Sequence, residues 1–441
     1  MATAQALVSK YFAGSRNDLV AGGVPVAAIA AAHGTPFFAY DAGVFDQKWV
    51  SLRTALPNEF GISYSMKANP LRPILEFFLV RGCGLEIASD GEFHQALAAG
   101  CKPEHVIFAG PGKTEAQLEL VLSLGIGEIH AESTLEIERI GRIARRLSVP
   151  ARVALRINPN ADAQGGAMRM GGKPAPFGVD EEELDAVLDL ILSDRVLSFR
   201  GIHLFSGTQI LDCKILLAQY RKGLELAGRV ADRLGRPLDT LDFGGGLGVP
   251  YFAQESELDM NGLREGLGEI FGEVRRDRRY AGTQFLVEPG RYLAAEAGLY
   301  ITRVSDIKTS RGKKFLIVDG GMNHHLAASG NLGQTIKRNY PLALVNKLWE
   351  PAEETVDVVG PLCTPLDVLA RNIDLPRAQV GDLICVFQSG AYSRSASPLG
   401  FLSHPTPPEV WLEAGQQTLV RSRGDYNDFV RDLCPSVPVR A

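Results

Sequence analysis

The sequence predicts an α/β protein built as a (β/α)8 TIM-like barrel followed by a mainly antiparallel β domain. Between residues 60 and 290, eight short apolar runs alternate with longer segments whose apolar residues recur every three or four positions. That alternation indicates eight strand–helix pairs. After residue 290 the apolar runs become β-branched and are separated by Gly, Pro and charge clusters, which is typical of an antiparallel sheet. A doubly wound open sheet is the structural alternative to the barrel.

The expected elements follow in chain order. The barrel strands are residues 62–66, 84–88, 106–109, 128–132, 151–158, 199–205, 238–243 and 284–288. The helices between them are residues 91–99, 115–123, 135–147, 181–192, 213–234 and 262–276, and the strands of the β domain are 300–309, 314–319, 355–359 and 383–387. The Gly- and Pro-rich residues 164–178 are expected to form a mobile loop above the barrel.

The domain boundaries follow from these elements. The short apolar run at residues 36–40 either leads into the barrel or joins the β domain. We therefore expect an N-terminal segment at residues 1–40 that can pair with the β domain, a barrel at 41–292 and a C-terminal β domain at 293–441.

Composition excludes several function classes. The chain has 441 residues, a net charge of -5 and no basic block, so nucleic acid is not an expected partner. It has no apolar run of the roughly 18 residues that a membrane span needs, and its N-terminus lacks a signal-peptide pattern. The six cysteines are scattered without a CxxC motif, which favours reduced thiols in a cytoplasmic protein and no zinc site. The one tight histidine pair, His324-His325, is interpreted as non-metal.

Lys67 stands where the first barrel strand is expected to end. In a (β/α)8 barrel the chemistry lies at the carboxyl ends of the strands. An amine fixed there is partly desolvated, which lowers its pKa and lets it form a Schiff base. The ordinary alternative is a solvated surface lysine.

Two further strand ends carry complementary chemistry. Gly244-Gly245-Gly246 follows the seventh strand and exposes backbone N–H groups that suit a phosphate, although glycines also make tight turns. The eighth strand ends at Glu288, with Arg291 close behind. A plain ion pair between Lys67 and Glu288 is the simpler interpretation. A lysine, a phosphate cradle and a distant carboxylate together predict pyridoxal 5'-phosphate as the cofactor.

With these motifs in place, the chain resembles the fold-type III pyridoxal-phosphate decarboxylases, which include diaminopimelate, ornithine and arginine decarboxylases. The resemblance runs from about residue 34 to 410 and rests on YSMKANP (64–70), EIASDGE (86–92), GGGLG (244–248), EPGR (288–291), GPLCTPLD (360–367) and GAY (390–392). It implies a barrel with a C-terminal β domain and a head-to-tail homodimer with shared active sites, in which the cysteine comes from the partner subunit.

The resemblance also implies roles for individual residues. Lys67 would hold the cofactor covalently, Glu288 would pair with its pyridinium nitrogen, and Glu86 would lie near the imine. Cys363 would return a proton to Cα after carbon dioxide leaves, a small buried thiol being the structural alternative. The phosphate contacts would be Gly245, Gly246, Gly290, Arg291 and Tyr392, with help from Thr208.

The chain departs from the family pattern beside the cofactor ring and at the distal end of the substrate. Phe205 stands where the family usually has a histidine stacked on the cofactor ring, and His203 on the same face is expected to compensate in part. Thr364 replaces the acidic residue that grips a distal ammonium in diaminopimelate and ornithine decarboxylases. Arg394 would meet a carboxylate or lie on the surface. The residues expected to face the substrate are Thr364, Asp367, Asn323, Ala327, Asn331 and Arg394.

The sequence therefore predicts α-decarboxylation of an amino acid with a modified or conjugated side chain. The candidates are an amino acid conjugated to citrate, of the siderophore type, and a glutamyl group on an acyl-carrier protein, of the antibiotic type. The alternatives are diaminopimelate decarboxylation, amino-acid racemisation and a non-catalytic pyridoxal-phosphate-binding protein. Glu288 argues against a racemase, because alanine racemases usually place an arginine near the pyridine nitrogen. The β domain argues against a non-catalytic relative, which is usually a barrel alone.

Overall fold

Contacts between residues divide the chain into two compact units, a β unit and a barrel unit. A computed structural model describes residues 3–15, 18–160, 168–169, 174–205, 207–334 and 336–434. The β unit comprises Met1–Phe45, Tyr251–Gln254 and Ala295–Ala441, and the barrel unit comprises Asp46–Pro250 and Glu255–Ala294. Among the described residues, no helix has both the length and the apolar character that a bilayer crossing demands.

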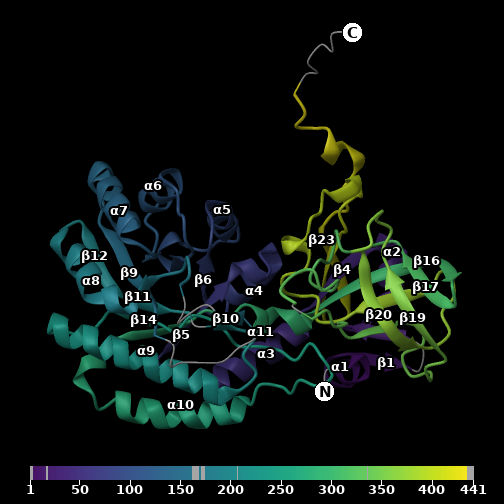
Figure 1. The fold of residues 1–441 in the computed structure, drawn as a ribbon, viewed down its shortest axis with the longest axis horizontal. Helices are drawn as coiled ribbons and strands as arrows, with labels where there is room; N and C mark the ends of the chain where they lie inside the picture. Colours follow the sequence, from purple (N-terminus) through teal and green to yellow (C-terminus); the bar gives the residue numbers. More distant parts are fainter. Residues whose placement is uncertain are drawn as a thin grey trace. The chain divides into compact units, whose positions relative to one another are not determined.

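The barrel unit is a closed barrel of eight parallel strands. The hydrogen-bonded order is β9-β12-β14-β15-β5-β6-β7-β8, and β8 pairs again with β9, which closes the sheet. Figure 1 shows helices on the outside of these strands. The strands are β5 (Phe60–Ser65), β6 (Gly84–Ile87), β7 (Val106–Phe108), β8 (Glu128–Ala131), β9 (Ala151–Asn158), β12 (Leu197–Leu204), β14 (Thr240–Asp242) and β15 (Gln284–Val287).

The barrel is the one that the sequence predicts, since each expected strand overlaps one of these eight. The helices are α3 (Ala42–Ala55), α4 (Arg72–Leu79), α5 (Asp90–Ala98), α6 (Glu115–Ser123), α7 (Thr134–Leu147), α8 (Leu184–Ser193), α9 (Cys213–Leu234), α10 (Met260–Val274) and α11 (Arg291–Ala294). Three short strands complete the unit: β10 (Met168–Arg169), β11 (Val179–Asp180) and β13 (Gly207–Thr208). Of the expected loop at 164–178, residues 164–167 and 170–173 lie outside the described residues.

Helix α7 illustrates how the sequence builds the outer layer. Ile137, Ile140 and Ile143 are buried and recur every third residue, so they form one apolar stripe against the strands. Ser133 caps the helix by accepting a hydrogen bond from the backbone N–H of Glu136 at 3.1 Å, a contact that contributes about 1 kcal/mol. The serine at position 133 therefore sets where helix α7 begins.

An aromatic cluster fixes the strands that carry two of the predicted motifs. Phe60 on β5 and Phe285 on β15 pack on Phe271 of α10, and Phe243, just after β14, packs on Phe60 and Phe285. Ring centroids lie 4.8 Å apart for Phe60 and Phe271 and 4.8 Å apart for Phe271 and Phe285. Each such pair contributes roughly 0.5–1.5 kcal/mol beyond the burial of its area. The ends of β14 and β15, which lead into the glycine turn and Glu288, are thus held by packing on the helix layer.

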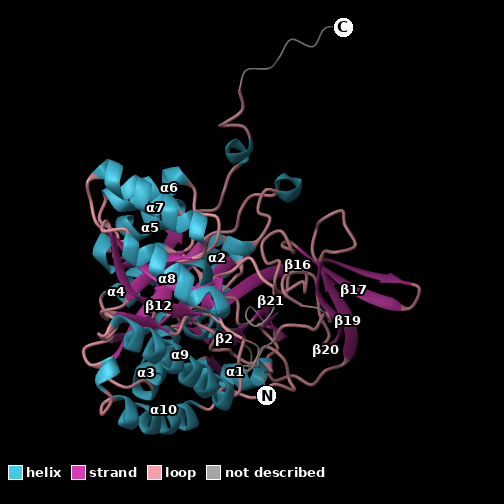
Figure 2. Cartoon of the chain, turned by 60° about the vertical axis from the view of Figure 1, so that its left-hand side comes forward, coloured by secondary structure: helices cyan, strands magenta, loops and turns pink. Residues whose placement is uncertain are grey.

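The β unit is built around a mixed sheet in the order β20-β19-β17-β16-β4-β22-β23, with β21 pairing with β16 and β18. Figure 2 shows β16, β17, β19 and β20 running beside one another. The pairs are antiparallel except for β17–β19 and β4–β22, which are parallel. These strands are β4 (Phe37–Asp41), β16 (Gly298–Ser310), β17 (Lys313–Val318), β18 (Leu342–Leu344), β19 (Glu354–Val359), β20 (Val368–Leu375), β21 (Leu383–Val386), β22 (Glu409–Glu413) and β23 (Gln416–Arg421).

The N-terminal residues of the β unit form a small sheet and two helices. The sheet runs β1-β2-β3. Its strands and the helices are β1 (Ala13–Ser15), β2 (Asp18–Ala21), β3 (Val24–Pro25), α1 (Ala4–Tyr11) and α2 (Val26–His33). Strand β4 then enters the large sheet between β16 and β22. Residues 36–40, which fitted either domain in the sequence, thus pair with strands from the end of the chain.

Candidate active site

Lys67 lies in a 3-10 turn, Met66–Ala68, directly after β5. Strand β5 ends one residue earlier than the expected strand at 62–66, so the lysine lies within a turn. Its Nζ is 3.1 Å from both carboxylate oxygens of Glu86 on β6. The side chain of Lys67 is 44% exposed while that of Glu86 is 1% exposed. A buried carboxylate therefore holds an amine that remains accessible to a ligand.

The Lys67 turn is fixed by its neighbours. The hydroxyl of Tyr64 donates to the carbonyl oxygen of Asn69 at 3.1 Å, and Asn69 Oδ1 accepts from the backbone N–H of Leu71 at 3.1 Å. The hydroxyl of Ser65 donates to Glu86. These bonds hold the lysine and its partner in one arrangement before any ligand enters.

The glycine turn after β14 has the backbone of an anion cradle. Gly244 and Gly246 have φ angles of 67° and 107°, which side chains rarely tolerate. A Cβ on Gly245 would lie 2.6 Å from the carbonyl oxygen of Glu288. Among the described residues, the N–H groups of Gly245 and Gly246 have no hydrogen-bond acceptor. Two free N–H groups on side-chain-free backbone fit the phosphate of the predicted cofactor.

Gly290 brings a second part of the predicted phosphate site beside the Lys67 turn. A Cβ on Gly290 would lie 2.9 Å from Cβ of Ala68 and 3.1 Å from Cβ of Ser65. Arg291 follows as the first residue of α11. Thr208 lies in β13, half-buried and paired in register with Met168. The structure therefore groups Lys67, Gly290 and Arg291 at the same barrel end.

Glu288 follows β15 and is buried with two histidines. Its Oε2 lies 3.3 Å from Nε2 of His203, and its Oε1 lies 3.9 Å from Nδ1 of His130. The two imidazole rings stack with centroids 4.3 Å apart. Oε1 of Glu288 has no hydrogen-bond partner among the described residues. An uncompensated buried carboxylate oxygen is costly, so this atom fits the protonated ring nitrogen of the cofactor.

The Glu288 cluster extends to residues that sequence reasoning did not assign. His130 Nε2 lies 3.1 Å from Oε1 of Glu128, and the hydroxyl of Thr240 donates to Oε2 of Glu128 at 2.9 Å. Asp242 Oδ1 accepts from the N–H of Gly244 at 2.7 Å. His130 stood at a predicted strand end, but only the parallel register β8-β9-β12 brings it beside His203.

Burial decides the charges in this cluster. Burial, helped by His130 and Arg156, lowers the pKa of His203 well below its usual value, so the imidazole is neutral. Burial, helped by the charge of Glu288, raises the pKa of Asp242 well above its usual value, which favours the protonated form of that carboxyl. The neutral His203 adds no positive charge beside Glu288, so the Glu288 carboxylate can receive a cationic ring nitrogen.

Phe205 and Arg156 line the opening of the barrel beside the glycine turn. A Cβ on Gly244 would lie 3.0 Å from Cδ2 of Phe205, and the Arg156 guanidinium carbon is 5.9 Å from the Phe205 ring centroid. Arg156 also donates to Oε1 of Glu132 at 2.7 Å. The Arg156–Glu132 pair is buried and was not assigned from the sequence, although both residues stand at predicted strand ends.

In the β unit, Asp367 organises the loop that carries Cys363 and Thr364. Its Oδ1 accepts from the N–H of Met322 at 2.7 Å, and its Oδ2 accepts from the N–H of Leu362 at 2.8 Å. Asp367 is 2% exposed. The carboxylate that the sequence assigned to the substrate therefore binds two backbone segments. Cys363 is exposed and Thr364 is half-buried.

The other predicted distal residues lie near the same loop. Asn323 is fully buried, and its side-chain Oδ1 and Nδ2 have no hydrogen-bond partner among the described residues. Ala327 is buried. Asn331 donates to the carbonyl oxygen of Leu366 at 3.2 Å and to the hydroxyl of Ser329 at 2.7 Å. Asn323 is the one whose polar atoms remain available to a ligand.

Two residues of the last motif have different surroundings. Tyr392 is half-buried and adopts a φ of 53°. Arg394 is largely buried, with Nε 3.7 Å from Oε2 of Glu409 and 3.4 Å from the carbonyl oxygen of Pro407. Glu409 also accepts from the hydroxyl of Tyr40 at 2.7 Å. Because Glu409 Oε2 also accepts from Arg421, Arg394 shares this carboxylate with a second arginine inside the β unit.

The adjacent histidines His324 and His325 are buried in the β unit and bind neighbours. His325 lies 2.9 Å from Oγ of Ser389 through Nε2, and its Nδ1 accepts from the N–H of Ala328 at 3.3 Å. His324 Nδ1 lies 3.2 Å from the Tyr300 hydroxyl. Burial lowers the pKa of each imidazole from 6.5 to about 3. Both histidines are therefore neutral in the folded protein.

We expect acid to destabilise the protein through these two histidines. The unfolded chain binds their protons below pH 6.5 and the folded chain only near pH 3, so their stabilising contribution is complete above 6.5 and is lost as pH falls through that window. From pH 7 to 5 the free energy of unfolding should fall by about 2 kcal/mol per histidine. Urea unfolding at pH 7 and at pH 5 measures this difference in the free energy of unfolding.

A matched pair of variants assigns this effect. His325→Gln should make the fall in unfolding free energy between pH 7 and pH 5 smaller by about 2 kcal/mol, whereas His94→Gln on the exposed side of α5 should leave that fall unchanged. A fall that is unaltered in His325→Gln would contradict the prediction.

Comparison with known proteins gives consistent matches over most of the chain. Residues 43–295 match the pyridoxal binding domain of the pyridoxal-dependent decarboxylases. The decarboxylase of L-glutamyl-BtrI acyl-carrier protein from Niallia circulans is 39% identical over 399 residues, which cover 90% of this chain and 93% of that relative. The 2-((L-alanin-3-ylcarbamoyl)methyl)-2-hydroxybutanedioate decarboxylase of Staphylococcus aureus is 30% identical, covering 87% and 95%.

A solved structure shows the same architecture. Diaminopimelate decarboxylase from Helicobacter pylori complexed with L-lysine superposes with a TM-score of 0.82 at 30% identity, covering 92% of this chain and 98% of that one.

Proposed function

Since the chain belongs to the family of pyridoxal-dependent decarboxylases, we propose that it removes the α-carboxyl group of a glutamyl residue carried as a thioester on an acyl-carrier protein. The observation that carries the proposal is the 39% identity, over 90% of the chain, to a decarboxylase of a glutamyl carrier protein. The neutral Thr364 agrees with it, because a conjugated side chain presents no distal ammonium for an acidic residue to bind.

The barrel unit supplies the residues that would hold the cofactor. When bound, pyridoxal phosphate accepts the electron pair that remains when carbon dioxide leaves. Lys67 would hold it covalently, while the N–H groups of Gly245 and Gly246 would bind its phosphate with Gly290 and Arg291. These assignments rest on the accessible amine, the free N–H groups and the grouping of the three motifs at one barrel end.

Glu288 would keep the cofactor's ring nitrogen protonated. His203 is neutral and burial raises the pKa of Asp242, so neither supplies a positive charge that would compete with the ring nitrogen for the Glu288 carboxylate. Glu86 would orient the Lys67 amine through the two contacts at 3.1 Å. Phe205 would lie against the face of the ring, as its place beside the glycine turn suggests.

The β unit would supply the proton and the substrate contacts. Cys363 is exposed, so its thiol is available to return a proton to Cα. We propose that it does so for the partner subunit of a homodimer, and measuring the mass of the particle in solution tests the dimer. Asn323 would offer its unpaired amide to the bound substrate.

A panel of substrates tests the proposed function. The panel contains L-glutamyl carrier protein, L-glutamyl pantetheine thioester, a citrate conjugate of diaminopropionate, free diaminopimelate and ornithine. Mass spectrometry measures the loss of carbon dioxide, and chiral chromatography detects racemisation. We expect kcat/KM for the glutamyl thioesters to exceed that for diaminopimelate by about a hundredfold, because the pocket lacks the charge that grips the free ammonium.

Equal turnover of diaminopimelate and the glutamyl thioesters would contradict the rebuilt pocket. Inversion without loss of carbon dioxide would replace the decarboxylase by a racemase. Selective turnover of the citrate conjugate would move the substrate to the chemistry of the Staphylococcus aureus relative.

A further inference from the structure

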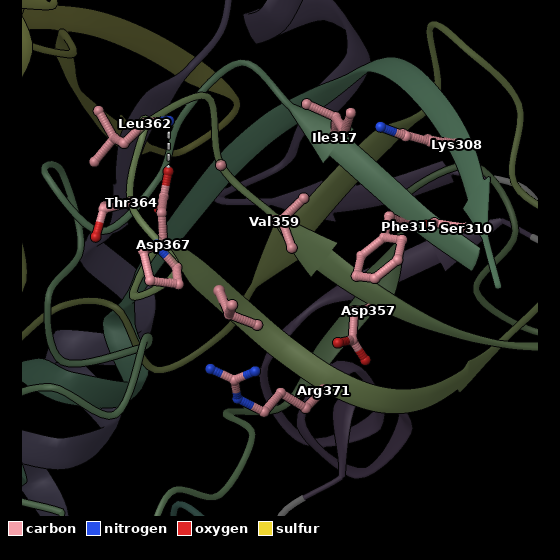
Figure 3. A pocket seen from close by; sticks show the side chains of 13 residues that line it. Lys308, Ser310, Phe315, Ile317, Asp357, Val359, Leu362, Thr364, Asp367 and Arg371 are labelled. Carbon is pink, nitrogen blue, oxygen red and sulfur yellow. Dashed lines mark hydrogen bonds between the residues drawn. The ribbon is translucent and has the colours of Figure 1, made fainter. Parts of the chain in front are cut away.

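A groove lies on one face of the β unit, next to the loop that carries Thr364. Its cavity volume is about 470 Å3, within the roughly 300–1,000 Å3 typical of small-molecule sites. Figure 3 shows Leu362 and Thr364 at one side of the groove and Lys308 and Ser310 at the other, with Val359 and Phe315 between them. The groove therefore runs away from the residue that replaces the ammonium-binding acid.

The floor of the groove follows from strand alternation. On β17 the side chains of Leu316 and Val318 are buried in the sheet's core, while Phe315 and Ile317, which alternate with them, point to the other face and are half-buried. Val359 at the end of β19 adds to the same face. The result is an apolar strip that remains open to a ligand.

Charge distinguishes this strip from an ordinary surface groove. Lys308 and Arg371 are exposed and line it, and neither has a carboxylate within 4.0 Å among the described residues. The lining holds two acidic residues, and both are occupied. Asp357 is paired with Lys313 at 2.8 Å and accepts from the N–H of Asn372 at 2.7 Å, while Asp367 accepts from the N–H groups of Met322 and Leu362. Two cations thus remain for an anionic ligand.

The start of the groove is structurally fixed. Asp367 holds Leu362 at 2.8 Å and Met322 at 2.7 Å through its two carboxylate oxygens. The backbone N–H of Thr364 donates to the carbonyl oxygen of Leu362 at 2.7 Å. The loop therefore presents Thr364 at the groove's edge in a defined position.

We propose that this groove binds the phosphopantetheine arm that joins the glutamyl group to its carrier protein, an inference that rests on the proposed function. Such an arm begins at the thioester, continues through amides and a dimethyl-substituted carbon, and ends in a phosphodiester. The groove offers the same order: Thr364, then Val359 and Phe315, then Ser310 and Lys308. Arg371 stands on β20, with β17 and β19 between it and Lys308 (Figure 3), and would meet the amide oxygens of the arm.

Substrates that differ only in the phosphate test the groove. L-glutamyl phosphopantetheine thioester and its unphosphorylated counterpart are compared on the holoenzyme. The phosphorylated form should have a KM lower by about fivefold, the upper value expected for one partly exposed ion pair. In the double variant Lys308→Ala, Arg371→Ala this advantage should disappear, while in Lys214→Gln, on the exposed start of α9, it should remain. Thermal unfolding checks that each variant is folded.

Binding measurements keep this test separate from the proposed function. Calorimetry with phosphopantetheine and pantetheine alone should show the same phosphate advantage and its loss in the double variant, whatever reaction the enzyme performs. Failure to decarboxylate any glutamyl thioester would overturn the proposed function only. Absence of the advantage in the wild type, or its survival in the double variant, would overturn the groove. Binding of the citrate conjugate, but not of phosphopantetheine, through Lys308 and Arg371 would overturn it as well.

Discussion

A Lys67→Ala variant is expected to lose decarboxylation by at least about a thousandfold, within the range that loss of a nucleophilic or acid–base group costs. The bound cofactor should also lose the visible absorbance that its link to a lysine produces. The physical reason is that Lys67 is the accessible amine at the barrel end, held at 3.1 Å from both oxygens of Glu86. Steady-state kinetics and an absorbance spectrum of the purified variant measure the two effects.

Lys67→Arg separates covalent chemistry from an ion pair. An arginine keeps the charge and can still bind the buried Glu86, but it does not form a Schiff base. We therefore expect Lys67→Arg to be as inactive as Lys67→Ala while unfolding at the wild-type temperature. Recovery of turnover in the arginine variant would mean that Lys67 acts only through its charge.

Glu288→Gln should reduce kcat by about a hundredfold to a thousandfold, which corresponds to about 2.7–4 kcal/mol of lost transition-state stabilisation. Glutamine has nearly the same shape but carries no charge, so it cannot keep a ring nitrogen protonated. The surroundings offer no ready substitute, because burial disfavours the charged forms of both His203 and Asp242. Stopped-flow and steady-state measurements on the cofactor-loaded variant give kcat.

The control for Glu288→Gln is the same exchange on the exposed face of α10, Glu265→Gln. It should behave as the wild type. Absorbance of the cofactor must be recorded in both variants, so that weaker binding is not mistaken for slower chemistry. A Glu288→Gln enzyme within fivefold of the wild-type kcat would remove Glu288 from its proposed role.

The barrel could be predicted because its strands are short, apolar and regularly spaced, and each is followed by an amphipathic segment. Strand β4 was ambiguous for a physical reason. All five of its residues are buried, so the run lacks the alternation that reveals which face meets the core. Strand β20 was missed because polar residues interrupt its second half, as in Arg371, Asn372 and Asp374.

The site was predictable where the residue types alone indicate the chemistry, as with Lys67 and the glycine turn. It was not predictable where contacts depend on register. His130 stands near Glu288 only because of the strand order, and its partner Glu128 lies two residues earlier on the same strand. Asp367 shows the same limit, since its backbone hydrogen bonds depend on a turn far away in sequence, at Met322.

The buried Asp367 clasp has a consequence for how such enzymes diversify. Because its carboxylate ties the loop of Thr364 at Leu362 to the separate segment at Met322, the side chain at position 364 can be exchanged while the backbone beneath it stays in place. Related enzymes can therefore change their substrate by a single substitution at this position, without a change in the loop's backbone. For the same reason, position 364 is the first one to vary in a library intended to redirect this decarboxylase to new amine products.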